Sequence, residues 1–291
     1  MFQCKGIVYE YDGTLDGFFC CVFESFAKKE TPLDIRPADA VQLTLEPVQR
    51  IETTAEKAAR VRRAVPNKIS PDAMRLIEHV FLTFLEQKEL RILNFLQLGF
   101  AVGRDVMRDL TNDTVSILFK AQKHLLNESH RYKQFVRFSA TGKVLVSVIK
   151  PLNQVLPMIA PHFIDRYPEE CFLIYDAIHG MALVSKPGQS AIVPVDSFVM
   201  DACGEEEQMY RELWCEYYDT IAIEQRYNPK CRMNHMPKRY WDEMTEFCRE
   251  NKPGLRKAGR YTSQSELEHV DEFERQGLAA QLAKNARPHI L

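Results

Sequence analysis

The spacing of apolar positions divides the first part of the chain into one strand and a series of helices. Residues 5–11 (KGIVYEY) predict a strand that Asp12-Gly13 closes. Phe18, Phe19, Val22, Phe23 and Phe26 then recur at helical spacing, which predicts a helix over 16–29 that Pro32 ends. Residues 40–52, broken by Pro47, predict a further short strand.

A block of helices follows over about 54–127. Thr53 or Thr54 is placed to cap a helix that carries KAARVRRAV. Ser70 and Pro71 form a cap followed by a proline at the first helical position, which predicts the start of the next helix. Residues 90–102 and 106–126 continue the helical pattern. We interpret this apolar block as scaffold.

The second half alternates more often between strand and helix patterns. Residues 135–138 and 144–149 predict a hairpin around Thr141-Gly142, and 154–166 predict a helix. Residues 171–176 and 181–185 predict a second hairpin through His179-Gly180. Two further predictions are an edge strand over 192–195 and a helix that begins at Glu205, with Met209, Leu213, Tyr217 and Ile221 on one face.

These elements predict an α+β fold that is mostly helical, with a small antiparallel sheet or hairpins. We expect a single domain over residues 1–248. The tail 249–291 is polar and carries one predicted helix over 265–284.

Composition is that of an ordinary globular protein, with 45% hydrophobic and 27% charged residues. The net charge of −2 excludes a globally basic DNA-coating protein, so a nucleic-acid surface has to be a local patch. No apolar run approaches the roughly 20 residues of a membrane span, and the N-terminus lacks the layout of a signal peptide. We therefore expect a cytoplasmic protein without a membrane partner. The eight cysteines show no metal-binding spacing, which favours reduced thiols.

Residues 120–143 form a local basic region, with six cations against the single anion Glu128. If residues 131–137 were a strand, Arg131, Lys133 and Arg137 would point to one side. Arginine suits phosphate because its planar fork donates two hydrogen bonds to one oxyanion. Arg166 is the further candidate contact. The alternative is a surface network of ion pairs with acids such as Glu128 and Asp165.

Three side chains in this half are candidates for catalysis: His130, His162 and Asp176. Histidines serve as general acid–base groups or as metal ligands. Two histidines and one aspartate make an incomplete metal set, so we assign neither a metal nor a cofactor. Hydrogen-bonded core histidines are the alternative interpretation.

A second basic segment, 226–241, contains five cations and no acid. Its cations are interleaved with aromatic residues, a pattern that suits single-stranded or flipped-base binding because rings stack on bases while cations hold phosphates. The candidate contacts are Arg226, Asn228, Lys230, Lys238, Arg239, Tyr240 and Trp241. Two alternatives remain open: arginines that pack on tryptophan at helix ends, and neutralisation by the acidic run 201–207.

The sequence E-Y-D-G-T-L at 10–15 resembles the phosphatase loop of the haloacid dehalogenase superfamily, in which D-x-D-G-T follows a strand. Glu10 occupies the nucleophile position, and Asp12 and Thr14 match the rest of the loop. The longer glutamate side chain would displace the attacking oxygen, which argues against this chemistry. A structural strand–turn–helix is the alternative.

Several collinear segments resemble a bacterial family named for DNA repair or DNA metabolism. They are YDGTLDGFFCCVFESF (11–26), HRYKQFVRF (130–138), V-L-P-x-I-A-x-H-F-x-x-R-Y (155–167), LIYD (173–176) and LWCEYYDTIAIEQRYNPK through HMPKRYW (213–241). Members of that family are typically encoded beside a radical SAM protein that is proposed to modify or repair DNA. Some are fused to a uracil-DNA-glycosylase-like domain, which we do not expect in this chain.

The resemblance implies a DNA repair protein that binds DNA or a damaged nucleotide and acts with a separate radical SAM enzyme. The partner must supply the cluster, because this chain lacks the C-x-x-x-C-x-x-C motif. The alternative from another class is a metal-dependent hydrolase or nuclease that uses His130, His162 and Asp176.

Overall fold

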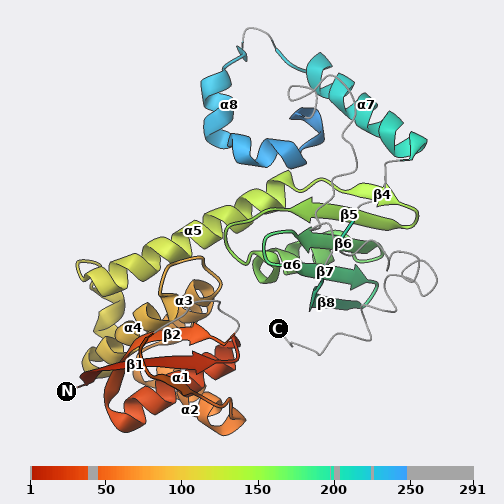
Figure 1. The fold of residues 1–291 in the computed structure, drawn as a ribbon. Coiled ribbons are helices and arrows are strands. Elements are labelled where there is room, and N and C mark those ends of the chain that lie inside the picture. Colours follow the sequence, from red (N-terminus) through yellow and green to blue (C-terminus); the bar gives the residue numbers. More distant parts are fainter. Residues whose placement is uncertain (1, 39–44, 197, 200–203, 224–225, 248–291) are drawn as a thin grey trace. The chain divides into compact units, whose positions relative to one another are not determined.

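The computed structural model describes residues 2–38, 45–196, 198–199, 204–223 and 226–247 (Figure 1). Packing divides the chain into two compact units, Met1–Asn127 and Glu128–Leu291, and each is described by itself. The expectation that residues 1–248 form one domain stays a prediction. The tail 249–291 and its predicted helix lie outside the described residues.

The first unit is built on a three-stranded parallel sheet in the order β2-β1-β3. The central strand β1 (Gln3–Tyr11) contains the predicted strand 5–11, and β2 (Glu30–Pro37) and β3 (Val48–Arg50) lie on either side of it. Between β1 and β2 runs α1 (Leu15–Lys28), which Thr14 caps by accepting a hydrogen bond from the Gly17 amide. This helix ends at Lys29 in a left-handed conformation, and Pro32 lies within β2 instead of ending the helix.

The remaining helices of the first unit follow the predicted order. They are α2 (Ala55–Lys68), α3 (Pro71–Phe81), α4 (Lys88–Val102) and the 3-10 helix η1 (Gly103–Arg108). The Ser70 hydroxyl accepts a hydrogen bond from the Ala73 amide, which confirms Ser70 as the cap of α3. A long helix, α5 (Asp113–Phe135), begins in the first unit and ends in the second.

Buried tyrosine hydroxyls connect β1 to the elements around it. Tyr9 and Tyr11 are two positions apart on the strand and lie in the core. Tyr9 donates to Glu30 Oε1 over 2.5 Å, and Tyr11 donates to Glu89 Oε1 over 3.0 Å. Each hydroxyl thus finds the partner that a buried polar group requires.

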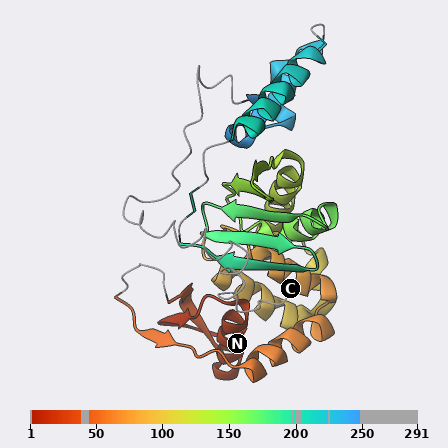
Figure 2. The ribbon, with the colours of Figure 1, turned by 90° about the vertical axis from the view of Figure 1, so that its right-hand side faces the viewer.

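The second unit contains a five-stranded mixed sheet in the order β4-β5-β6-β7-β8, whose green arrows are visible in Figure 2. Its strands are β4 (Ser139–Thr141), β5 (Val144–Ile149), β6 (Cys171–Asp176), β7 (Met181–Lys186) and β8 (Gln189–Pro194). Neighbouring strands pair antiparallel except for β5 and β6, which run parallel and are joined through α6 (Leu156–Arg166). The hairpin through His179-Gly180 and the edge position of β8 are confirmed.

After the sheet, the described chain returns to short helices. They are α7 (Glu205–Thr220), α8 (Pro229–His235) and the 3-10 helices η3 (Lys238–Glu243) and η4 (Thr245–Phe247). Among the helices of the described ranges, none is both long and apolar enough to cross a membrane.

The structure confirms a mixed α and β fold but corrects two parts of the prediction. In place of a small antiparallel sheet there are two sheets, one parallel and one mixed. The strand predicted over 135–138 is wrong, because α5 continues to Phe135 and β4 begins only at Ser139. Tyr132 and Phe135 are buried on this helix, so tertiary packing decides its length.

Glu30 offers a test of the first unit. Hydrogen bonds from Lys5 and Tyr9 lower the pKa of Glu30 below its ordinary 4.5. We expect Glu30→Gln to reduce the free energy of unfolding by about 1–3 kcal/mol at pH 7, because charged hydrogen bonds to a buried group are lost. A carboxylate with a lowered folded pKa stabilises above its unfolded pKa and loses this contribution as pH falls through the folded value.

The difference between the parent protein and Glu30→Gln should therefore shrink as the pH falls below about 4. Urea unfolding of the full chain at several pH values measures it, with Glu56→Gln on the exposed surface of α2 as the matched control. A difference that is constant with pH would contradict the ion-pair explanation.

Candidate nucleic-acid interface

A buried carboxylate, Glu128, connects three segments of the second unit. Its oxygens accept hydrogen bonds from the backbone amides of Leu152 (3.1 Å) and Asn153 (2.9 Å) and from the Asn153 side-chain amide. The Arg239 guanidinium completes the set, and the Glu128 side chain is 1% exposed. A charge this deep is stable only because it is paired and hydrogen-bonded on every side.

Arg239 also organises the aromatic residues around it. Its guanidinium lies over the Tyr240 ring, 4.6 Å from the centroid, and donates to the Tyr240 hydroxyl. The Tyr240 ring packs against Tyr132 and Phe135, with centroids 5.2 and 5.4 Å apart. The last turns of α5 and the start of η3 therefore form one packed cluster.

A second ion pair holds the end of this region. Arg137 Nη2 lies 2.8 Å from Glu246 Oε1, and the Trp214 indole donates to Glu246 Oε2 over 3.1 Å. Burial by itself would raise the pKa of Glu246, but the hydrogen bonds from Arg137 and Trp214 outweigh it and lower this pKa. Arg137 is thus a structural cation in this unit.

Arg232 occupies the centre of an aromatic stack. Its guanidinium lies 5.0 Å from the Trp241 ring centroid, 5.2 Å from Phe247 and 5.9 Å from Tyr227. Trp241 and Phe247 stack on each other at 4.6 Å, and the Trp241 indole donates to the Met236 carbonyl. This is the packing of arginine on tryptophan that the sequence left open as an alternative.

The basic segment 226–241 thus divides its cations into two groups. Arg232 and Arg239 hold the aromatic rings, whereas Arg226, Lys230 and Lys238 are exposed and, within the described residues, form no ion pair with a carboxylate. The Lys238 ammonium also lies 5.8 Å from the centroid of the Trp241 ring. Tyr240 and Trp241 are buried, so their ring faces are not open to a base. Tyr227 is 70% exposed and lies beside these cations in sequence.

Asn228, a predicted nucleic-acid contact, has a structural role in the same segment. Its side chain caps α8 by accepting a hydrogen bond from the Cys231 amide over 2.9 Å. Arg166, the other predicted phosphate contact, is exposed at the last position of α6. Within the described residues, no hydrogen bond or ion pair joins Arg166 to the segment, so its part in binding stays a prediction.

Arg131 and Lys133 lie on α5, which corrects the idea that a strand points them to one side together with Arg137. Residues two positions apart on a helix are separated by about 200° around the axis. Both side chains are partly exposed.

The three candidate catalytic residues have separate surroundings. His130 is exposed on α5 and shares a 3.0 Å hydrogen bond with Gln134, and His162 is exposed on α6. Asp176 is buried, bonds the ring of His179 over 2.6 Å and accepts from the amides of Ile178 and His179, which shapes the β6–β7 turn. Within the described ranges, no group of three or more histidine, cysteine or acidic side chains is arranged to hold a metal.

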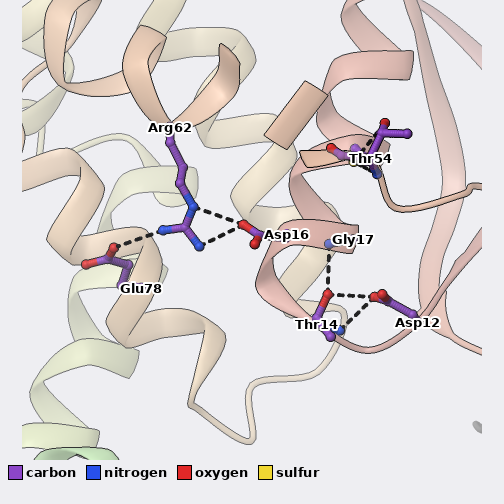
Figure 3. A network of polar contacts seen from close by, with 8 residues as sticks. Asp12, Thr14, Asp16, Gly17, Thr54, Arg62 and Glu78 are labelled. Atoms are coloured by element: carbon purple, nitrogen blue, oxygen red, sulfur yellow. Dashed lines mark hydrogen bonds and ion pairs between the residues drawn. The ribbon is translucent and has the colours of Figure 1, made fainter. Parts of the chain in front are cut away.

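Hydrogen bonds join Asp12, Thr14 and Gly17 in the loop between β1 and α1 (Figure 3). Asp12 Oδ1 accepts from the amide and hydroxyl of Thr14, and Asp12 Oδ2 accepts from Thr53 over 2.8 Å. Although burial alone would raise the pKa of Asp12, these hydrogen bonds lower it. Glu10 lies half-buried, 3.7 Å from Arg36. The network gives Asp12 the structural role of holding the turn into α1.

The sequence does not reveal the two carboxylates, Glu128 and Glu246, that hold the second unit together. The sequence indicates Glu128 only as a possible partner in a surface ion pair, and no pattern singles out Glu246. A lone acid within a basic stretch is the signal that could have identified Glu128, because such a residue has many potential cationic partners. No local pattern indicates that its partner is Arg239, which lies 111 positions away.

Glu128 provides a test of this arrangement. We expect Glu128→Ala to destabilise the second unit by about 3–5 kcal/mol, because Arg239 and the donors of Asn153 lose their buried acceptor. Amide hydrogen exchange should become faster at Leu152 and Asn153, and less so in Glu128→Gln, which retains one acceptor oxygen. Glu169→Ala, at an exposed site, is the control. Unchanged exchange at both amides would show that the carboxylate does not hold this loop.

Comparison with known proteins adds a family but no relative of established activity. No curated protein and no solved structure matches the chain. Residues 86–246 match DUF4130, which is described as a domain of unknown function. The matched range contains Glu128, the five-stranded sheet and the basic segment 226–241, and it spans more than half of the 291 residues. The chain therefore belongs to the DUF4130 family.

Proposed function

We propose that this protein binds DNA or a damaged nucleotide through the basic segment 226–241 and works in DNA repair with a separate radical SAM enzyme. The observation that supports binding is that some cations of the segment have internal partners whereas others are exposed. Arg232 and Arg239 are occupied with aromatic rings and Glu128, while Arg226, Lys230 and Lys238 are exposed and, in the described part of the chain, have no carboxylate partner, although Lys238 also lies over the Trp241 ring. These three cations, with the exposed ring of Tyr227, offer what a single strand or an unstacked base requires.

The internal supports make this surface suited to binding. Because ion pairs and stacking hold the aromatic rings beneath it, less side-chain ordering is needed when a ligand arrives. No acid lies between residues 226 and 241, so the three exposed cations are not offset by a carboxylate of the segment itself. In a chain of net charge −2, such a segment attracts phosphate locally without coating DNA generally.

The radical SAM partner is supported by sequence resemblance. Segments 130–138 and 213–241 resemble a family whose members are encoded beside such enzymes, and this chain has no C-x-x-x-C-x-x-C motif for a cluster of its own. In this proposal the chain presents the nucleotide and the partner performs the reaction. The metal-dependent hydrolase alternative lacks a ligand group in the described part of the chain.

Binding can be tested with fluorescein-labelled single-stranded DNA by anisotropy at several salt concentrations. We expect the triple variant Arg226→Ala, Lys230→Ala, Lys238→Ala to bind more weakly and to lower the salt slope by about two, since each lost phosphate contact on a single strand contributes about 0.7. Tyr227→Ala should weaken binding by roughly tenfold without changing the slope, because stacking releases no counterions.

The matched control replaces three exposed cations elsewhere, in the variant Arg104→Ala, Arg108→Ala, Lys186→Ala. It changes the net charge by the same amount but leaves segment 226–241 intact. If it weakens binding as much as the first triple variant, the effect is one of net charge and the proposed surface is wrong. Undetectable binding by the folded parent protein at low salt would argue for an adaptor that contacts only proteins.

A second test separates presentation from catalysis. We expect the purified protein, with or without Mg²⁺ or Mn²⁺, to leave damaged and undamaged DNA intact. His130→Ala and His162→Ala should impair only the joint reaction with the radical SAM enzyme. Gel analysis of DNA and chromatography of nucleotides measure both. Metal-dependent cleavage that disappears in both histidine variants would establish the hydrolase instead.

A further inference from the structure

Helix α7 presents two different sides. One side attaches it to its own unit: Cys215 bonds the Thr245 carbonyl, the Tyr218 ring packs against Phe247 at 5.7 Å, and Arg211 bonds the Ser139 hydroxyl. These contacts leave little freedom for the helix to rotate about its axis. The direction in which its other side chains point is therefore fixed by the fold.

The other side carries large apolar side chains that are exposed, and Trp214 at its edge is exposed while its indole N–H donates to Glu246. We refer to these apolar side chains as the α7 stripe: Met209, Tyr210, Leu213, Trp214, Tyr217 and Ile221, each between 42% and 58% exposed. At about 100° per residue they cover an arc of about 140°. This is the width by which a helix normally packs onto a core, yet here the arc faces outward. Contiguous exposed apolar residues of this extent mark interaction sites in soluble proteins.

The charges along α7 indicate the chemistry of the partner. The helix has six carboxylates and one guanidinium, EEEQMYRELWCEYYDT, which gives a net charge of −5. Glu205, Glu212 and Glu216 fall along one edge of the stripe by helical spacing, and all three are exposed. Such a surface repels phosphate, so nucleic acid is excluded as its ligand, and it attracts cations.

We propose that the α7 stripe binds a cationic amphipathic helix of a partner protein. Met209, Leu213, Tyr217 and Ile221 recur every four residues and form a ridge, into which the apolar side chains of a second helix can pack. Trp214 and Tyr210 widen the surface with the residue types that supply most binding energy at interfaces. Lysines or arginines beside the partner's apolar face would meet Glu212 and Glu216. This inference does not depend on DNA binding by segment 226–241.

The probe is an 18-residue peptide with leucines on one helical face and lysines on the other, labelled with fluorescein. With the full chain we expect saturable binding by anisotropy that weakens with salt, and a blue shift of Trp214 emission that is absent in Trp214→Phe. Leu213→Ser with Tyr217→Ser should weaken binding by at least roughly tenfold. Glu212→Lys with Glu216→Lys should weaken it too and should remove most of its salt dependence.

Two controls match these changes. Leu110→Ser with Ile178→Ser removes equally exposed apolar side chains elsewhere and should leave binding unchanged. A peptide of the same composition, shuffled so that its leucines share no face, should bind much more weakly. Affinity for single-stranded DNA, measured in the same variants, should not change with Leu213→Ser and Tyr217→Ser, which separates this surface from the one proposed for DNA.

Three outcomes would overturn the proposal. The first is equal peptide binding by all variants, or no binding at all. The second is a dimer in sedimentation that becomes a monomer in Leu213→Ser with Tyr217→Ser, which would make a second copy the occupant. The third is binding only by a chain shortened after Phe247, which would show that the protein's own C-terminal residues cover the stripe.

Discussion

The second unit depends on a single buried charge. Glu128 accepts hydrogen bonds from the loop before α6 and from Arg239 at the start of η3, so the end of α5, the sheet connection and the basic segment share one anchor. Removing a carboxylate from water is costly, and the cost is offset only while all of these donors are in place. An arrangement of these segments that loses one of the donors therefore leaves the buried carboxylate less well compensated.

Internal pairing of some cations, with others left exposed, also explains how a slightly acidic protein can have a local basic surface. Arg137 and Arg239 are neutralised by Glu246 and Glu128, and the Arg232 guanidinium spreads over aromatic faces. Of the five cations in segment 226–241, Arg226, Lys230 and Lys238 are exposed and form no ion pair with a carboxylate within the described residues. Counting charges along the chain overestimates the surface potential, because charges that are structural partners have little effect at a distance.

The sequence identified most elements but not the partners that hold them together. Strands such as 144–149 and 171–176 show their type through local pattern, and Ser70 shows the start of its helix. The strand predicted at 135–138 failed because Tyr132 and Phe135 pack against Tyr240, more than 100 residues later. The parallel pairing of strands β1 and β3 likewise joins residues that local periodicity does not connect. The same holds for the ion pair between Arg239 and Glu128.

The distance between Glu128 and Arg239 along the chain has a consequence for synthesis. A ribosome makes residues 128–194, and with them the whole five-stranded sheet, before Arg239 exists. Asn153 can bond Glu128 early, since only 25 positions separate them, but the carboxylate must wait for its cation. Glu128 on α5 therefore lacks its cationic partner while the sheet forms, and the synthesis of residue 239 completes the set of donors around this carboxylate.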